Sequence, residues 1–277
     1  MSGWRFRHVI GIVGGLGPIA HLEFERRLLA AIESPSSDQE YPEWVLSSIP
    51  QTPDRTRALL GDGPSPVPWL LRGLDRLAGS CDFAVITCVT AHAFLDEIRA
   101  RARLPILDLV EVSAREAARC CGQPSGKNAR VGLLATVGTL RSRVFHRALE
   151  RIAPELSIVS PLDLPDGERL QEDLVMRPIY GPLRAGHRQT GGIKSGGDRD
   201  PETGVAHRET LSRAARLLVE AGAACVVTGC TEIPLALGRE PVDGTPLLDP
   251  LDLAARTAVR IARGELPLPD SSVPSDG

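Results

Sequence analysis

The chain has 277 residues, a formal net charge of −3 at pH 7, and a composition that is 42% hydrophobic and 24% charged. This hydrophobic content excludes a largely disordered chain, and the length allows one or two domains with buried cores. The slightly acidic balance offers no basic surface for nucleic acid or for an anionic membrane, so we expect neither as a partner.

Six cysteines are too few for a disulfide scaffold in a chain of this length. The apolar run that follows the basic first residues is too short for a secretory signal, and no stretch approaches the length of a membrane span. We therefore expect a cytoplasmic protein whose thiols are free to react.

Short apolar runs alternate with amphipathic stretches along the whole chain. This alternation predicts an α/β fold in which parallel sheets are flanked by helices. In chain order, we predict a strand at 9–13, a helix at 20–32, a strand at 44–48, a helix at 67–77, a strand at 83–87, a helix at 93–101, a strand at 106–107, a helix at 110–120, a strand at 131–134, a helix at 140–152, a strand at 157–160, a helix at 209–220, a strand at 225–228, and a strand end with a helix within 247–263.

The sequence also contains an internal repeat. Residues 10–18 resemble residues 131–139, and residues 84–88 resemble residues 226–230. The second pair of matching segments is farther apart in sequence than the first pair. The difference is about the length of a polar, glycine-rich stretch that has no hydrophobic periodicity. We therefore predict two pseudo-symmetric domains, an insertion in the second and a flexible tail. The first domain is predicted at 1–117, with 245–265 packing back on it. The second domain is predicted at 118–244, with a flexible loop or lid at 187–207, and the tail at 266–277.

Cys88 and Cys230 occupy equivalent places in the two copies, each at the end of a strand and ahead of a helical segment. Ligands of parallel sheets bind beyond the carboxyl ends of the strands, so we expect both thiols to face one site in a cleft between the domains. A helix N-terminus favours the thiolate form of a cysteine. We expect the other four cysteines, Cys81, Cys120, Cys121 and Cys225, to be packing residues.

Two matched thiols suit a reaction that moves a proton from one face of a carbon atom to the other. One group acts as base, the other as acid, and their roles are exchanged after each turnover. Electrostatic stabilisation of the carbanion would make an electron-sink cofactor unnecessary, so we expect no cofactor. The only two lysines, Lys127 and Lys194, fall in polar loops, which does not favour a pyridoxal phosphate site.

Several motifs resemble the aspartate/glutamate racemase family. They lie at 10–18, 50–56, 88–92, 134–139, 179–186 and 229–235, and together they cover nearly the whole chain in order. Glu232, which follows Cys230-Thr231, is closer to the aspartate-racemase branch than to the glutamate-racemase branch. The resemblance implies two pseudo-symmetric α/β domains, no cofactor, an amino acid as substrate and a homodimer.

When the family's residue roles are transferred by position, the resemblance implies that Cys88 and Cys230 are the acid/base thiols. Arg55 would bind a carboxylate with its bidentate guanidinium group. His92 would polarise the Cys88 thiol or serve a structural role, and Glu232 is similarly placed beside Cys230. The threonines would hold the substrate or cap helices. The implied substrate-binding residues are Gly15, Gly17, Arg55, Thr90, Thr136, Thr139, Thr231 and Arg184. No metal site is expected, because Cys88 and His92 supply only two ligands.

Three positions depart from the family pattern and leave the substrate open. Val89 stands where asparagine is usual, His21 where threonine is common, and Arg184 where lysine is frequent. Aspartate, glutamate or a related amino acid is therefore expected. Alternatives are a maleate-type isomerase, a hydantoin-type racemase or decarboxylase on the same scaffold, and a non-catalytic sensor. A nucleotide-dependent oxidoreductase is less favoured, because the glycine pattern at 15–20 lacks an acidic residue at 47–51.

Overall fold

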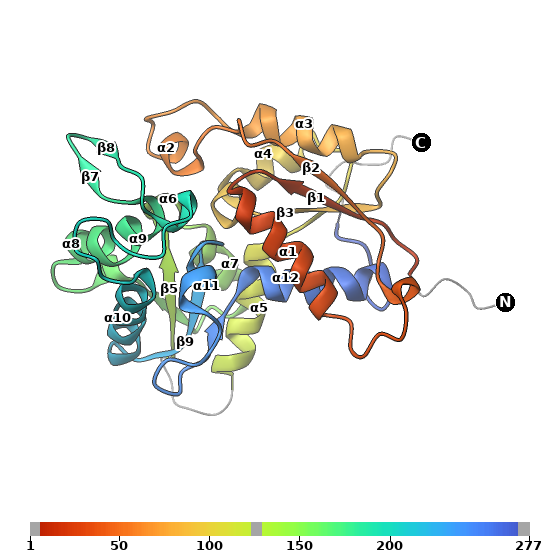
Figure 1. Cartoon of the computed structure of the whole chain (residues 1–277). Coiled ribbons are helices and arrows are strands. Elements are labelled where there is room, and N and C mark those ends of the chain that lie inside the picture. The colour runs from red at the N-terminus through yellow and green to blue at the C-terminus, as the bar shows by residue number, and fades with distance from the viewer. Residues whose placement is uncertain (1–5, 123–128, 271–277) are drawn as a thin grey trace. The chain divides into compact units, whose positions relative to one another are not determined.

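Two four-stranded parallel sheets form the centres of the protein, in a computed structural model that describes residues 6–122 and 129–270 (Figure 1). Each sheet belongs to one compact unit. Unit 1 consists of Met1–Val112 and Leu251–Gly277, and unit 2 consists of Ser113–Pro250. Of the predicted tail, residues 266–270 have no regular secondary structure, and residues 271–277 lie outside the described residues.

The sheet of unit 1 has the order β2-β1-β3-β4. All five residues of β1 are buried, as expected for a central strand covered on both faces. Figure 1 shows α3 and α4 on one face of this sheet and α1 and α12 on the other. The elements are β1 (Ile10–Gly14), α1 (Pro18–Ala30), η1 (Asp38–Glu40), β2 (Trp44–Ser48), α2 (Arg55–Leu59), α3 (Val67–Leu77), β3 (Phe83–Ile86), η2 (Val89–Phe94), α4 (Leu95–Arg99), β4 (Ile106–Leu107) and α12 (Pro250–Ala262), and α5 (Leu109–Cys121) continues into unit 2.

The sheet of unit 2 has the order β10-β9-β5-β6. Its helix α10 packs against the two central strands, β5 and β9. The elements are β5 (Arg130–Ala135), α6 (Val137–Ser142), α7 (Val144–Ile152), β6 (Ser157–Val159), η3 (Pro161–Asp163), α8 (Gly167–Gln171), the π-helical turn η4 (Glu172–Met176), α9 (Arg177–Tyr180), β7 (Leu183–Arg184), β8 (His187–Arg188), η5 (Ile193–Ser195), α10 (His207–Glu220), β9 (Ala223–Gly229), α11 (Ile233–Leu237) and β10 (Leu247–Leu248).

The two sheets have the same topology, which confirms the internal repeat. β1 and β3 are the central neighbours in unit 1, and β5 and β9 are the central neighbours in unit 2. These are the strands that the sequence comparison pairs. The predicted α/β fold with parallel sheets flanked by helices is therefore confirmed.

One prediction about local structure is wrong. The helix predicted at 140–152 is divided into α6 and α7, because Arg143 between them adopts a left-handed conformation with a φ of 56°. The segment 187–207, predicted to be a flexible loop or lid, contains β8 and η5, and α10 begins at its last residue. Its strand β8 pairs with β7 in an antiparallel hairpin.

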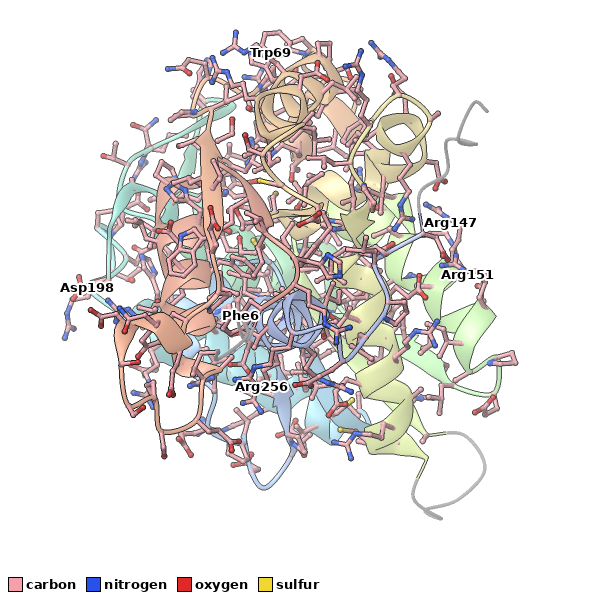
Figure 2. The ribbon with its side chains drawn as sticks, turned by 90° about the vertical axis from the view of Figure 1, so that its right-hand side faces the viewer. Phe6, Trp69, Arg147, Arg151, Asp198 and Arg256 are labelled. Carbon is pink, nitrogen blue, oxygen red and sulfur yellow. The ribbon has the colours of Figure 1, made fainter. Side chains whose placement is uncertain are left out.

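Helix α7 buries the apolar side chains Phe145, Ala148 and Leu149 and turns charged side chains outwards. Arg147 and Arg151 of α7 are both exposed, and Figure 2 shows them at the surface. In the part of the chain that the structure describes, no helix is both long and apolar enough to cross a membrane.

Adjacent leucines of α1 provide a test of this core. Leu28 is fully buried, whereas Leu29 is 43% exposed. We expect Leu28→Ala to lower the free energy of unfolding of unit 1 by about 2–5 kcal/mol, because the truncation leaves a cavity. Leu29→Ala should change it by less than about 0.5 kcal/mol. All three tryptophans precede Ser113, so tryptophan fluorescence during urea unfolding reports on unit 1. Equal losses in both variants would contradict this packing.

Candidate functional site

Cys88 lies two residues beyond the carboxyl end of β3 and is buried, at 5% exposure. Its carbonyl oxygen accepts hydrogen bonds from the Ala91 amide, at 3.2 Å, and from His92 Nδ1, at 2.9 Å. His92 Nε2 accepts a hydrogen bond from the Leu109 amide at 3.2 Å. Because both ring nitrogens bind backbone groups, His92 fixes the turn that carries Cys88. Its hydrogen bonds do not support the alternative that His92 polarises the thiol.

The glycine-rich turn between β1 and α1 lies at the same end of the sheet. Gly15 has a φ of 85°, and a Cβ atom there would lie 2.6 Å from the backbone of Ile49. Glycine is therefore needed for the close approach of the segment that follows β2. The Gly15 amide donates to His21 Nδ1 at 3.2 Å, and burial lowers the pKa of His21, which favours the neutral ring. Gly17 has a φ of 121° and precedes α1.

Arg55 begins α2 and is 6% exposed. Its guanidinium group donates to the carbonyl oxygens of Leu16 at 2.7 Å, of Pro53 at 3.0 Å and of Thr52 at 3.4 Å. Arg55 therefore fastens the 50–56 motif to the glycine-rich turn. Helix α2 also contacts η2, which contains the buried Thr90.

Cys230 occupies the corresponding place in unit 2, directly beyond β9. Its Sγ donates to Glu232 Oε2 at 3.0 Å, and the Thr231 hydroxyl donates to the same oxygen at 3.1 Å. The other carboxylate oxygen, Oε1, lies 2.7 Å from Lys194 Nζ. The Glu232 side chain is 4% exposed and that of Lys194 is 20% exposed. This group of four residues, Cys230, Thr231, Glu232 and Lys194, is called the Cys230 cluster below.

The charges of the Cys230 cluster act on the thiol in opposite directions. Burial and then the negative charge of Glu232 raise the pKa of Cys230 well above its ordinary value, and the charge of Lys194 offsets part of this shift. Burial alone would raise the pKa of Glu232, but Lys194 and the donors Cys230 and Thr231 hold it below its usual value. At neutral pH, Glu232 is therefore a carboxylate and Cys230 a thiol.

Lys194 is a residue that sequence reasoning misplaced. It was predicted to lie in a polar loop, but η5 brings it to the buried Glu232. The two residues are far apart in sequence, and no local pattern joins them. Lys127, the other lysine, lies outside the described residues.

Thr136 and Thr139 lie at the carboxyl end of β5, and both are 1% exposed. Thr136 is the N-cap of α6, and its hydroxyl accepts the Thr139 amide at 3.3 Å. The two hydroxyl oxygens are 3.1 Å apart. Gln171, which the sequence analysis did not single out, donates to the Ala135 carbonyl at 2.8 Å. Its Oε1 is buried without a hydrogen-bond partner among the described residues, which leaves an acceptor near this strand end.

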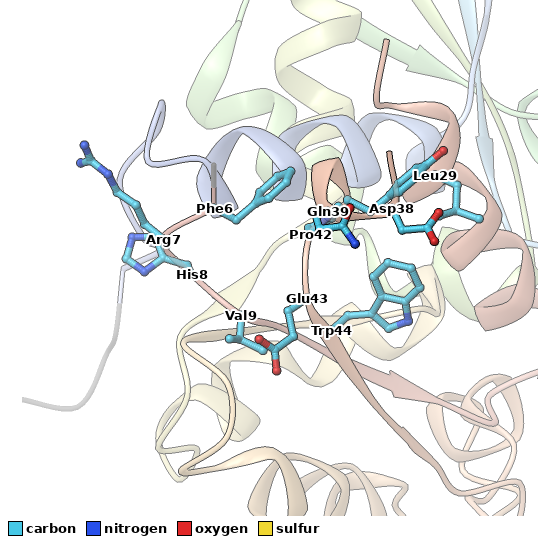
Figure 3. Close-up of a pocket in the computed structure, with 11 residues that line it drawn as sticks. Phe6, Arg7, His8, Val9, Leu29, Asp38, Gln39, Pro42, Glu43 and Trp44 are labelled. Carbon is cyan, nitrogen blue, oxygen red and sulfur yellow. The ribbon is translucent and has the colours of Figure 1, made fainter. Parts of the chain in front are cut away.

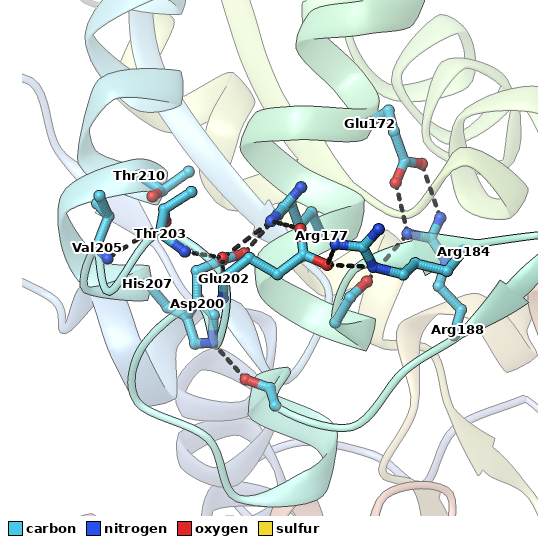
Figure 4. Close-up of polar contacts among 12 residues, drawn as sticks. Glu172, Arg177, Arg184, Arg188, Asp200, Glu202, Thr203, Val205, His207 and Thr210 are labelled. Carbon is cyan, nitrogen blue, oxygen red and sulfur yellow. Dashed lines mark hydrogen bonds and ion pairs between the residues drawn. The ribbon is translucent and has the colours of Figure 1, made fainter.

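The inserted segment 187–207 is held by ion pairs (Figure 4). Arg177 pairs with Asp200 and with Glu202, and Arg188 pairs with Glu172. Arg184 is 67% exposed and lies 2.6 Å from Glu202. In the described part of the chain, the side-chain contacts of Arg184 are with this network and not with the Cys230 cluster.

A cavity of about 810 Å³ in unit 1 lies away from Cys88. Figure 3 shows Val9 and Trp44 among its lining residues. These residues lie where β1 and β2 begin, whereas ligands of parallel sheets bind where the strands end. Within residues 6–122 and 129–270, no group of three or more His, Cys, Asp or Glu residues is arranged to hold a metal ion.

Known proteins resemble this chain over much of its length. A family model described as Asp/Glu/Hydantoin racemase matches residues 13–171. The glutamate racemase of Geobacter metallireducens is 29% identical over 188 residues, which are 65% of this chain and 56% of that protein. The broad specificity amino-acid racemase RacX of Bacillus subtilis is 25% identical over 146 residues, which are 51% of this chain and 60% of that protein. The matches therefore span about half the length of these curated relatives.

A solved structure matches almost the whole chain. The aspartate racemase of Picrophilus torridus superimposes with a TM-score of 0.70 at 22% identity, covering 93% of this chain and 95% of that one. At this identity, the likeness establishes the fold.

We expect the ion pair between Arg177 and Asp200 to make the local stability of the inserted segment depend on pH. The hydrogen bond from Arg177 lowers the pKa of Asp200 well below its ordinary value. Asp200 Oδ1 also accepts the amides of Glu202 and Thr203, each at 2.9 Å. At pH 7, we expect Asp200→Asn to reduce the hydrogen-exchange protection of these amides by roughly 10- to 100-fold, since a hydrogen bond to a charged group contributes about 1.5–3 kcal/mol.

The difference in protection between Asp200→Asn and the unmodified protein should narrow as the pH falls below about 4. In that range Asp200 binds a proton in the opened segment but not in the folded one, where its pKa is lower, so the stabilisation of the folded segment is lost. Asp198→Asn is the matched control, because Asp198 is exposed two residues away. Hydrogen exchange measured by mass spectrometry at pH 7 and below pH 4 checks the prediction. A difference independent of pH would contradict it.

Proposed function

Because this chain belongs to the Asp/Glu/Hydantoin racemase family, we propose that it is an amino-acid racemase that inverts the configuration at Cα by proton transfer between two cysteines. One observation carries the proposal. Cys88 and Cys230 follow equivalent central strands, β3 and β9, in two sheets of the same topology. Such a repeat supplies two thiols for the two faces of one carbon atom.

In the proposed reaction, the Cys88 thiolate removes the Cα proton and becomes a thiol. The Cys230 thiol then donates its proton to the opposite face of the carbanion and becomes a thiolate. The reverse transfers convert the other enantiomer. The hydrogen bond from Cys230 to Glu232 supports the assignment of Cys230 as the resting acid. No cofactor takes part, because the carbanion is stabilised by donors around the carboxylate group.

The proposed substrate is aspartate, glutamate or a related amino acid. The racemases named among the relatives support this class. We propose that Thr90, Thr136, Thr139 and Thr231 hold the α-carboxylate, with Gly15 and Gly17 allowing the close approach of backbone amides. Arg55 would contribute its positive charge beside the glycine-rich turn, and Arg184 would act from β7, the strand that pairs with β8 of the inserted segment.

Val89 is 1% exposed and cannot form a side-chain hydrogen bond, so this position does not select a polar group of the substrate. The family description also includes hydantoin racemases, which makes a hydantoin-type substrate the second candidate. A homodimer and a cytoplasmic location remain predictions from the sequence.

Deuterium incorporation tests the proposed proton transfer. In deuterium oxide, the product enantiomer should carry deuterium at Cα, because the donating thiol exchanges with solvent. Chiral chromatography with mass spectrometry measures both the configuration and the label. Inversion without Cα deuterium would contradict the two-thiol mechanism.

Substitution of each thiol tests the roles separately. We expect Cys88→Ala and Cys230→Ala each to reduce racemisation by roughly 10²- to 10⁴-fold, the usual contribution of a general acid or base. Cys120→Ala is the control, because Cys120 lies at the end of α5 and has no proposed role. A Cys230→Ala variant that keeps most of its activity would favour an isomerase or decarboxylase that uses one thiol.

A further inference from the structure

Lys194 carries the positive charge of the Cys230 cluster, although it comes from the inserted segment. Its ammonium group lies 2.7 Å from Glu232 and 5.3 Å from the centre of the Tyr180 ring. Arg188 lies against the same ring, at 5.9 Å. Among the described residues of unit 2, the charged or titratable groups around the thiol are therefore Glu232 and Lys194, with Tyr180 and Arg188 behind Lys194.

The inserted segment is built to hold Lys194 in this place. Ile193, its neighbour in η5, is buried in the core of unit 2 together with Ile233 of α11. The Ser195 hydroxyl accepts the Gly191 amide and donates to the Gly192 carbonyl, both at 2.9 Å. Farther along, the pair of Arg188 with Glu172 and the pair of Arg177 with Asp200 fasten both ends. The backbone of Lys194 is therefore fixed on both sides.

Glu232 needs this cation because it is almost completely buried. An ionised carboxylate without a partner in such a place is destabilised by several kcal/mol. Its Oε1 atom is paired with Lys194, and its Oε2 atom accepts both the Cys230 thiol and the Thr231 hydroxyl. Loss of Lys194 would leave the carboxylate with neutral donors on one oxygen only.

We propose that Lys194 is a positioning residue for Cys230: it orients the Glu232 carboxylate and offsets its negative charge at the thiol, so that the carboxylate holds the Cys230 thiol in place as a proton donor. The inference rests on the proposed function for the role of this thiol. It assigns a purpose to the insertion, which supplies unit 2 with a cation. The equivalent position two residues after Cys88 is Thr90, which carries no charge.

The reactivity of the Cys230 thiol provides a test that does not need turnover. The rate of its alkylation by iodoacetamide, followed by peptide mass spectrometry from pH 6 to pH 10, reports the fraction of thiolate. We expect Lys194→Met to slow this reaction by roughly 10-fold or more near neutral pH, equivalent to a shift of the profile by at least about one pH unit. Glu232→Gln should shift it in the opposite direction, because Lys194 then faces the thiol without a counter-charge.

Two variants serve as controls. Lys194→Arg keeps the charge and should retain the wild-type profile, and Arg208→Met removes an exposed cation of α10 and should have no effect. The ultraviolet absorbance of the thiolate, taken as the difference from Cys230→Ala, gives the same profile without reagent access. A loosened structure would make Cys230 more reactive in both Lys194→Met and Glu232→Gln, and this common direction would overturn the proposal. An unchanged profile in Lys194→Met would also overturn it.

Racemisation kinetics separate this inference from the proposed function. If Lys194 binds substrate directly, Lys194→Met raises KM while the alkylation profile stays in place, and the positioning role fails. If the protein shows no racemisation but the alkylation profiles shift as expected, the proposed function fails and the role of Lys194 at the thiol stands.

Discussion

The buried carboxylate of Glu232 is the constraint around which unit 2 is organised. A charge in this position is tolerated only when donors and a cation surround it. The donors, Cys230 and Thr231, follow the carboxyl end of β9. Ligands of parallel sheets bind at this end of the strands. The cation comes from another part of the chain, through a hairpin and a short helix that ion pairs hold in place. The fold around Glu232 thus combines a repeated sheet with an added segment.

A symmetric architecture here carries an asymmetric chemistry. Both sheets place a cysteine beyond a central strand, so the backbone offers the two thiols equivalent positions. The side chains around them differ. Cys230 has a carboxylate and an ammonium group beside it, whereas the turn of Cys88 is fixed by hydrogen bonds of His92 to two backbone groups. In the proposed reaction, this difference sets which thiol starts with the proton.

The sequence contains the repeat, the strands and both cysteines in forms that local patterns can reveal. The predicted strands at 44–48 and 106–107 begin with apolar residues, and the structure places β2 and β4 at these positions. Lys194 and Gln171 could not be found in this way, because each acts through a contact with a residue distant in sequence. The break at Arg143 has no glycine or proline to signal it. Its left-handed backbone, with a φ of 56°, is uncommon for a residue other than glycine, so local propensity does not predict it.

The return of the chain to unit 1 has a consequence for biosynthesis. Helix α12 belongs to unit 1, although more than a hundred residues of unit 2 precede it. The amides of Arg7 and His8 donate to the Ala262 carbonyl, and Ala254, Ala255 and Ala258 of α12 are fully buried. A ribosome releases the whole of unit 2 before it completes unit 1. Domains fold as units during synthesis. Unit 1 therefore cannot complete its fold until α12 has been synthesised, and unit 2, although its synthesis begins later, is the first to be complete.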